Sequence, residues 1–158
     1  MASRTRRFSL VVLSVLALSA CSAGVGVDGT SSVTGGAIEL AVSDTCGGET
    51  DSRCLAVNGQ NIILPSTFER AGVENAAVAQ GDGQNAVDVT FTESGAAVLQ
   101  ALTEKAAHSG DTARLVMKID GEIRAAVAVM QALEGDYLLI HLSPEDNAQE
   151  VVDAIHGG

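Results

Sequence analysis

Two alternating apolar runs, joined at Asp120-Gly121, indicate that residues 115–130 form a β-hairpin. Successive side chains of a strand point to opposite faces, and Asp-Gly supplies the positive φ values that a two-residue hairpin turn requires. One apolar face is therefore expected on each strand, made of Leu115, Met117 and Ile119 before the turn and of Ile123, Ala125, Val127 and Val129 after it. A sheet must be part of the fold.

Similar patterns predict further strands in the segment from residue 37 to residue 158. The short apolar runs at 53–57 and 60–64 are typical of strands. In 86–92, one face is made of Val87, Val89 and Phe91. In 136–142, one face is made of Leu138, Ile140 and Leu142, and the other of Tyr137, Leu139 and His141.

Two segments place apolar residues at helical spacing next to capping residues. The first follows Thr92 as N-cap and stops at Gly110, with a buried stripe of Val98, Leu99, Leu102 and Ala106. The second is expected to begin at Pro144, with Ser143 as N-cap and Asp146 at the capping-box position, and its stripe is Ala148, Val151, Val152 and Ile155. Residues 37–158 are predicted to form one α+β domain, a mainly antiparallel sheet with two helices packed on one face.

The N-terminus has the layout of a secretion signal. Three arginines precede the apolar run 8–20, which is too short for a stable membrane span and ends at Cys21. The stretch Leu18, Ser19, Ala20 and Cys21 matches the bacterial lipobox, in which the cysteine is acylated and becomes the new N-terminus. Residues 1–20 are thus expected to be a lipoprotein signal peptide and Cys21 the lipidation site. The alternatives are an ordinary signal peptide followed by a chance cysteine and, for the export route, a twin-arginine signal at Arg6-Arg7.

Acylation would hold the chain on the extracytoplasmic face of the cell membrane, because two or more buried acyl chains give a stable anchor. Residues 21–36 are small, polar and glycine-rich, and we expect them to form a flexible tether with a reach of about 20 Å. Removal of residues 1–20 takes away three of the nine basic residues and none of the 20 acidic ones, which leaves a formal net charge of −14. This charge disfavours nucleic acid as a partner.

Outside the lipobox the chain has two cysteines, Cys46 and Cys54. An even pair in an oxidising compartment predicts a disulfide. The alternatives are a metal pair or a redox pair, although the spacing is not Cys-x-x-Cys and no histidine lies nearby in the sequence.

The chain lacks the common catalytic motifs, so we expect no enzyme activity, no cofactor and no metal site. There is no Gly-x-Ser-x-Gly, no His-Glu-x-x-His, no phosphate-binding loop and no dinucleotide fingerprint. His108, His141 and His156 fall on separate predicted elements, and Asp82-Gly83 and Asp120-Gly121 are interpreted as turn residues. The absence of tryptophan and the single tyrosine leave few aromatic platforms for sugars or bases.

The order of these elements from Ile62 to Gly158 resembles the head subdomain of the first extracytoplasmic domain of SecD and fused SecDF, accessory subunits of bacterial protein export. The similar stretches are the segment from Leu64 to Val78, the strand and helix of 87–107 with its Thr-x-x-Gly-Ala start, the Asp-Gly hairpin, and the closing helix with Gly157-Gly158. The resemblance implies binding of emerging preprotein. The chain lacks the family's set of transmembrane helices, so coupling to a proton gradient is not expected.

The leading hypothesis is therefore a non-enzymatic, lipid-anchored envelope protein that binds unfolded or envelope proteins through an exposed sheet edge. Its binding residues cannot be named from the sequence. The alternative is a carrier of a small ligand or lipid, which predicts a closed apolar pocket, and a remote third possibility is an enzyme.

Overall fold

The computed structural model describes residues 35–47, 52–80 and 85–158, which belong to one compact unit. The expected signal peptide, the lipidation site Cys21, most of the tether and the Asp82-Gly83 turn lie outside the described residues. Among those described, no helix is long and apolar enough to cross a membrane.

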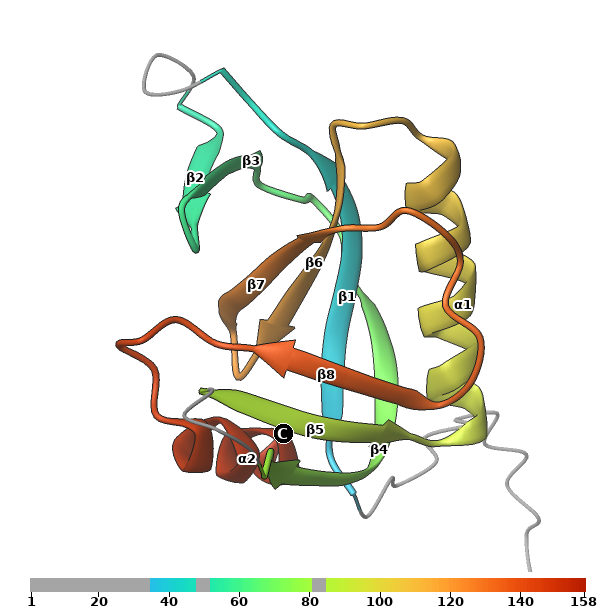
Figure 1. Ribbon diagram of the computed structural model, residues 1–158, viewed down its shortest axis with the longest axis vertical. Coiled ribbons are helices and arrows are strands. Elements are labelled where there is room, and N and C mark those ends of the chain that lie inside the picture. Colours follow the sequence, from blue (N-terminus) through green and yellow to red (C-terminus); the bar gives the residue numbers. More distant parts are fainter. Residues whose placement is uncertain (1–34, 48–51, 81–84) are drawn as a thin grey trace, which may run out of the picture. The chain divides into compact units, whose positions relative to one another are not determined.

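The fold is α+β, as predicted, and is built on a six-stranded antiparallel sheet with the strand order β7-β6-β1-β4-β5-β8 (Figure 1). Its strands are β1 (Ala37–Asp44), β4 (Glu69–Val78), β5 (Ala86–Phe91), β6 (Ala113–Ile119), β7 (Glu122–Ala128) and β8 (Tyr137–His141). A separate hairpin consists of β2 (Cys54–Val57) and β3 (Gln60–Ile63), and the helices are α1 (Glu93–His108) and α2 (Ala148–Gly157).

Both helices contribute to one hydrophobic core with the same face of the sheet. This face is made largely of aliphatic side chains, and Phe91 is its one fully buried aromatic residue. The predicted stripe of α2 is buried throughout, and that of α1 is buried except for Val98, which is partly exposed. The core residues from the strands include Ile38, Leu40, Val73, Val87, Val89, Leu115, Met117, Ile119 and Ile140.

The β2–β3 hairpin lies on the opposite side of β6 and β7. Val57 and Ile62 of this hairpin form a second, smaller cluster with Val116 and Ala126 of the sheet. Because Val116 alternates with Leu115 and Met117, the two clusters lie on opposite faces of β6. The sheet is therefore covered by helices on one side and, over part of its width, by a hairpin on the other.

The β6–β7 hairpin has the predicted turn, with Asp120 at φ 49° and Gly121 at φ 79°. One detail of the prediction is wrong, because Ile123 does not share a face with Ala125. Met117 pairs with Ala125 while Lys118 pairs with Ile123, so Arg124 is an extra residue in β7. This β-bulge interrupts the alternation, and Ile123 packs on the smaller cluster while Ala125 lies in the main core.

The start of α1 explains the Thr-x-x-Gly-Ala stretch. The predicted N-cap Thr92 accepts a hydrogen bond from the Gly95 amide at 3.1 Å, and the Thr92 amide donates to the Gly72 carbonyl at 2.9 Å. A Cβ atom on Gly95 would lie 2.1 Å from that same carbonyl oxygen. Glycine is thus required where α1 begins, because the backbone of β4 is in direct contact with the helix.

The start of α2 differs from the prediction. The helix begins at Ala148 with Asn147 as N-cap, not at Pro144 with Ser143 as N-cap. Ser143 and Asp146 instead close a turn of their own: the Asp146 amide donates to the Ser143 carbonyl at 3.0 Å, and the Ser143 amide donates to the Asp146 carboxylate at 3.2 Å. Proline is favoured at the second position of such a turn as well as at a helix start, so its presence does not distinguish the two.

The last two residues of the predicted tether, Gly35 and Gly36, lie against the domain. The Gly36 carbonyl accepts a hydrogen bond from the Val73 amide at 3.0 Å. A Cβ atom on Gly36 would lie 1.7 Å from the Ile155 carbonyl oxygen, at a φ of +91°. The chain is therefore already fixed two residues before β1 begins.

Candidate functional site

The outer edge of β8 has no neighbouring strand among the described residues, since β8 ends the strand order and pairs only with β5. The hydrogen bonds at its two ends identify which groups face β5: the Phe91 amide donates to the Asp136 carbonyl at 2.7 Å, and the Leu142 amide donates to the Asn85 carbonyl at 2.8 Å. In an antiparallel ladder, backbone groups alternate between the two neighbours of a strand. The amides and carbonyls of Tyr137, Leu139 and His141 thus point away from the sheet.

The side chains of these three residues lie together on one face of β8, as predicted, and the structure shows that this face is the exposed one. Tyr137 is 58 % exposed and Leu139 is 38 % exposed, and His141 is exposed as well. Leu138 and Ile140 point to the other face, where Ile140 is buried in the core. Edge β8 therefore combines outward backbone groups with accessible apolar surface.

Both ends of β8 are fixed by hydrogen bonds from other elements. Before the strand, the Leu133 amide donates to the buried Thr103 hydroxyl of α1 at 3.0 Å. After it, the Asn85 side-chain amide donates to the Ser143 and Asp146 carbonyls, both at 2.7 Å. A partner at this edge would thus meet a pre-ordered strand, which lowers the entropic cost of binding.

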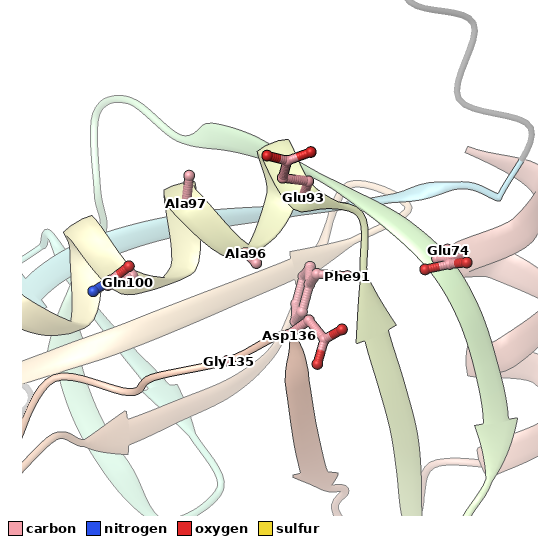
Figure 2. A pocket seen from close by; sticks show the side chains of 8 residues that line it. All are labelled: Glu74, Phe91, Glu93, Ala96, Ala97, Gln100, Gly135 and Asp136. Carbon is pink, nitrogen blue, oxygen red and sulfur yellow. The ribbon is translucent and has the colours of Figure 1, made fainter.

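A broad, open pocket of about 640 Å³ lies where β8 begins (Figure 2). Carboxylates from three elements border it, namely Glu74 of β4, Glu93 of α1 and Asp136 next to β8, and all three are exposed. Figure 2 shows Phe91 between these acidic side chains. The remaining residues of its lining are Ala96, Ala97, Gln100 and Gly135. None of the described residues that line this pocket is basic, so the lining favours a cation over an anion.

Tyr137 contacts a carboxylate on the outer face of the sheet. Its hydroxyl donates a hydrogen bond to Asp88, which lies on the adjacent strand β5. This hydrogen bond, together with desolvation and the negative charge of Asp88, raises the pKa of Tyr137 above its usual value of 10.0. The hydrogen bond places the Tyr137 hydroxyl beside Asp88 of β5.

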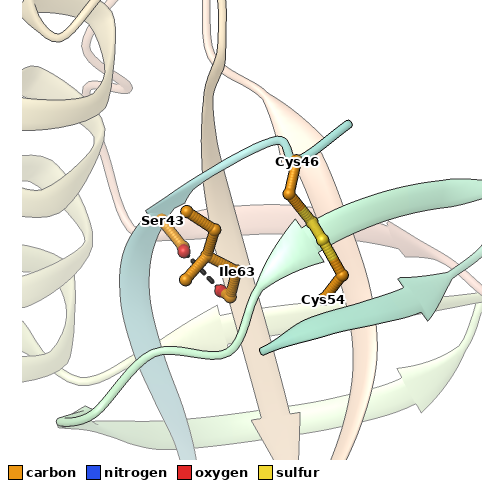
Figure 3. The surroundings of a disulfide bond; sticks show 4 residues. All are labelled: Ser43, Cys46, Cys54 and Ile63. Carbon is orange, nitrogen blue, oxygen red and sulfur yellow. Dashed lines mark hydrogen bonds between the residues drawn. A yellow bond between two sulfur atoms is a disulfide. The ribbon is translucent and has the colours of Figure 1, made fainter. Parts of the chain in front are cut away.

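Cys46 and Cys54 lie at disulfide-bonding distance, with their sulfur atoms 2.08 Å apart, in agreement with the predicted disulfide (Figure 3). The pair links the segment after β1 to the start of β2. Close by, the Ser43 hydroxyl donates to the Ile63 carbonyl at 2.5 Å. The position of the Cys46–Cys54 pair favours a structural role, in which the disulfide holds the β2–β3 hairpin to β1.

The three histidines lie on separate elements, as expected from the sequence. His108 is in the last turn of α1, where its Nδ1 is 2.9 Å from the Glu104 carbonyl; His156 is in the last turn of α2, and His141 is on β8. Within residues 35–47, 52–80 and 85–158, no group of three or more His, Cys, Asp or Glu side chains is arranged to hold a metal ion.

The sequence predicted that Tyr137, Leu139 and His141 share one face of β8, but it did not predict the acidic pocket. Glu93 and Asp136 flank predicted elements, and their positions next to a helix start and a strand start could have marked them. Glu74 lies in a strand that the sequence did not predict in full. Its proximity to the other two depends on pairings between distant segments.

Comparisons with protein-family models, with curated proteins and with solved structures found no match. The resemblance to the SecD head subdomain therefore stays a prediction.

Proposed function

We propose that this chain is a non-enzymatic, lipid-anchored protein of the cell envelope whose domain binds extended protein segments as an additional strand beside β8. The observation that supports this most is the outward row of backbone groups at Tyr137, Leu139 and His141 next to exposed apolar surface. Edge-strand addition gives affinity through main-chain hydrogen bonds and specificity through alternate side chains.

The other two parts of the proposal are the envelope location and the relationship to the SecD head. The first rests on the lipobox at Leu18 to Cys21. The second is supported by the order of elements after Ile62, which includes the Thr92-capped helix, the Asp120-Gly121 hairpin and a closing helix. Unfolded secretory proteins would be natural partners, because they offer extended segments outside the cytoplasm.

A carrier of a small ligand or lipid receives less support. Such a protein needs a closed apolar cavity, whereas the pocket at the start of β8 is open and bordered by Glu74, Glu93 and Asp136. The side chains between the sheet and the helices are aliphatic and packed together.

Binding at the edge can be tested with the full chain in mild detergent and an unfolded secretory protein as probe. We expect saturable binding that Leu139→Pro weakens about tenfold, because proline removes an outward donor and its ring obstructs the edge. The matched control Leu139→Thr keeps the amide and suits a strand, so it should bind within about threefold of the unchanged chain. Circular dichroism should show that both variants fold.

Absence of saturable binding by the unchanged chain would refute edge binding. Equal binding by Leu139→Pro and Leu139→Thr would place the partner elsewhere. The anchor is tested separately by fatty-acid labelling in cells: the unchanged chain should incorporate label and Cys21→Ala should not.

A further inference from the structure

We propose that the segment bound at β8 runs antiparallel to it, places an apolar side chain opposite Leu139, and carries a basic residue at its C-terminal end beside Asp136. This inference rests on the proposed function, since it describes the chemistry of the partner at the same edge.

The apolar position follows from strand geometry. A residue that pairs directly with Leu139 has its side chain on the same face of the sheet. There it would contact Leu139 and the ring of Tyr137, which are 38 % and 58 % exposed. An aliphatic residue at this point would remove apolar surface from water on both partners.

The basic position follows from the different charges at the two ends of β8. At its start lie Asp136 and, across the adjoining pocket, Glu74 and Glu93, and the lining has no basic side chain in the part of the chain that the structure describes. At its end lies His141, and of the two carboxylates in the turn that follows, Asp146 is paired with Arg124 at 2.6 Å and Glu145 is exposed. With three exposed carboxylates at the start and one at the end, the start of the strand is the more negative end.

The direction follows from the pairing of the sheet. Every neighbouring pair in it is antiparallel, and antiparallel pairing is slightly more stable per residue than parallel pairing. A segment added in the same way has its C-terminal end beside the start of β8, so its basic residue must lie there.

A second copy of this chain fits the edge less well. In a two-fold antiparallel pair centred on Leu139, the residue opposite Asp136 would be Leu142 of the other copy, which offers no positive charge. Both copies would also carry a net charge of the same sign, −11 for the full chain, and like charges oppose association.

The experiment compares labelled peptides by fluorescence anisotropy with the full chain in mild detergent. The first is Thr-Val-Thr-Val-Thr-Val-Lys-Lys, the second has the same residues in reverse order, and the third ends in two glutamines instead of two lysines. We expect the first to bind about threefold to fivefold more tightly than either of the others, since a solvent-exposed ion pair contributes up to about fivefold. Added salt should reduce this preference.

Asp136→Asn should reduce the preference for the lysine-ended peptide about threefold or more, while the glutamine-ended peptide should bind as before. Glu104→Gln, which makes the same charge change on α1 outside the pocket, should leave the preference intact. Leu139→Pro should weaken all three peptides.

The outcomes separate the two proposals. If the three peptides bind equally and Leu139→Pro weakens them all, the basic-end inference is overturned while edge binding stands. Tighter binding of the reversed peptide would overturn the antiparallel direction. If no peptide binds, both the inference and the proposed function are refuted.

Discussion

The two edge strands of the sheet, β7 and β8, differ in the elements and charges that surround them. At β7, the β2–β3 hairpin covers one face of the strand, and the Asn58 side chain donates to the Arg124 carbonyl at 3.1 Å. The Arg124 side chain pairs with Glu122 at 2.5 Å and with Asp146 at 2.6 Å. At β8, no described strand or hairpin takes the corresponding place.

Edge strands invite pairing with other chains, and proteins usually blunt them with charges, bulges or a covering segment. Edge β7 uses all three, because the bulge at Arg124 adds to the charge and the cover. Edge β8 exposes Tyr137 and Leu139, and β7 also exposes one apolar side chain, Val127 at 40 %. Among the described residues, β8 lacks the bulge and the covering hairpin of β7, which supports β8 over β7 as the edge for an added strand in the proposed function.

The largest expected effect comes from releasing the cover of β7. Replacing both Cys46 and Cys54 by serine should lower the free energy of unfolding by about 2.5 kcal/mol, because the bond closes a loop of about nine residues in the unfolded chain. Denaturant unfolding of the oxidised protein and the double variant measures this loss.

The same double variant tests whether the hairpin protects β7. We expect concentration-dependent association in sedimentation experiments, which the intact protein should not show to the same degree. Peptide binding at β8 should be unchanged and serves as the control. A loss of stability below about 0.5 kcal/mol would mean that the disulfide adds little to the hold on the hairpin.

A smaller effect is expected from loosening the support of β8. In Thr103→Val the partly buried Leu133 amide loses its acceptor, and a fully buried donor left unsatisfied costs about 1–3 kcal/mol. Because this amide is only partly buried, we expect a loss of about 1 kcal/mol in the free energy of unfolding and faster hydrogen exchange at the Leu133 amide. Thr103→Ser keeps the hydroxyl and should restore slow exchange; if it exchanges as fast as Thr103→Val, the hydrogen bond does not fix this segment.

The elements near the edges of the sheet could be predicted because one face of each is exposed. In β5 buried residues alternate with half-buried ones, in β8 exposed residues alternate with more buried ones, and α1 has Thr92 and Gly110 at its ends. Half-exposed elements show their period in the sequence. This is why the grouping of Tyr137, Leu139 and His141 on one face was predicted correctly.

The two central strands were largely missed. β1 buries residues on both faces, for example the neighbours Leu40 and Ala41, and a strand covered on both sides has little alternation. β4 contains small residues such as Ala71 and Gly72, and its register shifts between Val73 and Asn75. Low strand propensity and a bulge together conceal its period.

The candidate site depends on strand order, which no local pattern contains. That β8 is an edge follows only from the pairing of β5 with both β4 and β8.

The predicted start of α2 was wrong for a different reason. The residues from Ser143 to Asp146 satisfy the rules for a turn and for a helix cap equally well. The hydrogen bonds from Asn85, far away in the sequence, hold this stretch as a turn.

The smallest expected effect concerns the contact between Tyr137 and Asp88 at the open edge. Tyr137 is the only tyrosine and the chain has no tryptophan, so phenolate absorbance reports this one group. Because the pKa of Tyr137 is raised above 10.0 in the folded protein, the contact stabilises the fold below pH 10 and its contribution is lost as the pH rises through the folded pKa.

Titration of the intact protein should give a midpoint for Tyr137 above 10.0. The substitution Asp88→Ala should lower this midpoint toward the value of the unfolded chain. Thr90→Ala, on the same face of β5, should leave the midpoint where it is in the intact protein. An unchanged midpoint in Asp88→Ala would mean that Tyr137 is not held against β5, and the apolar surface offered by β8 would then be a mobile ring instead of a fixed platform.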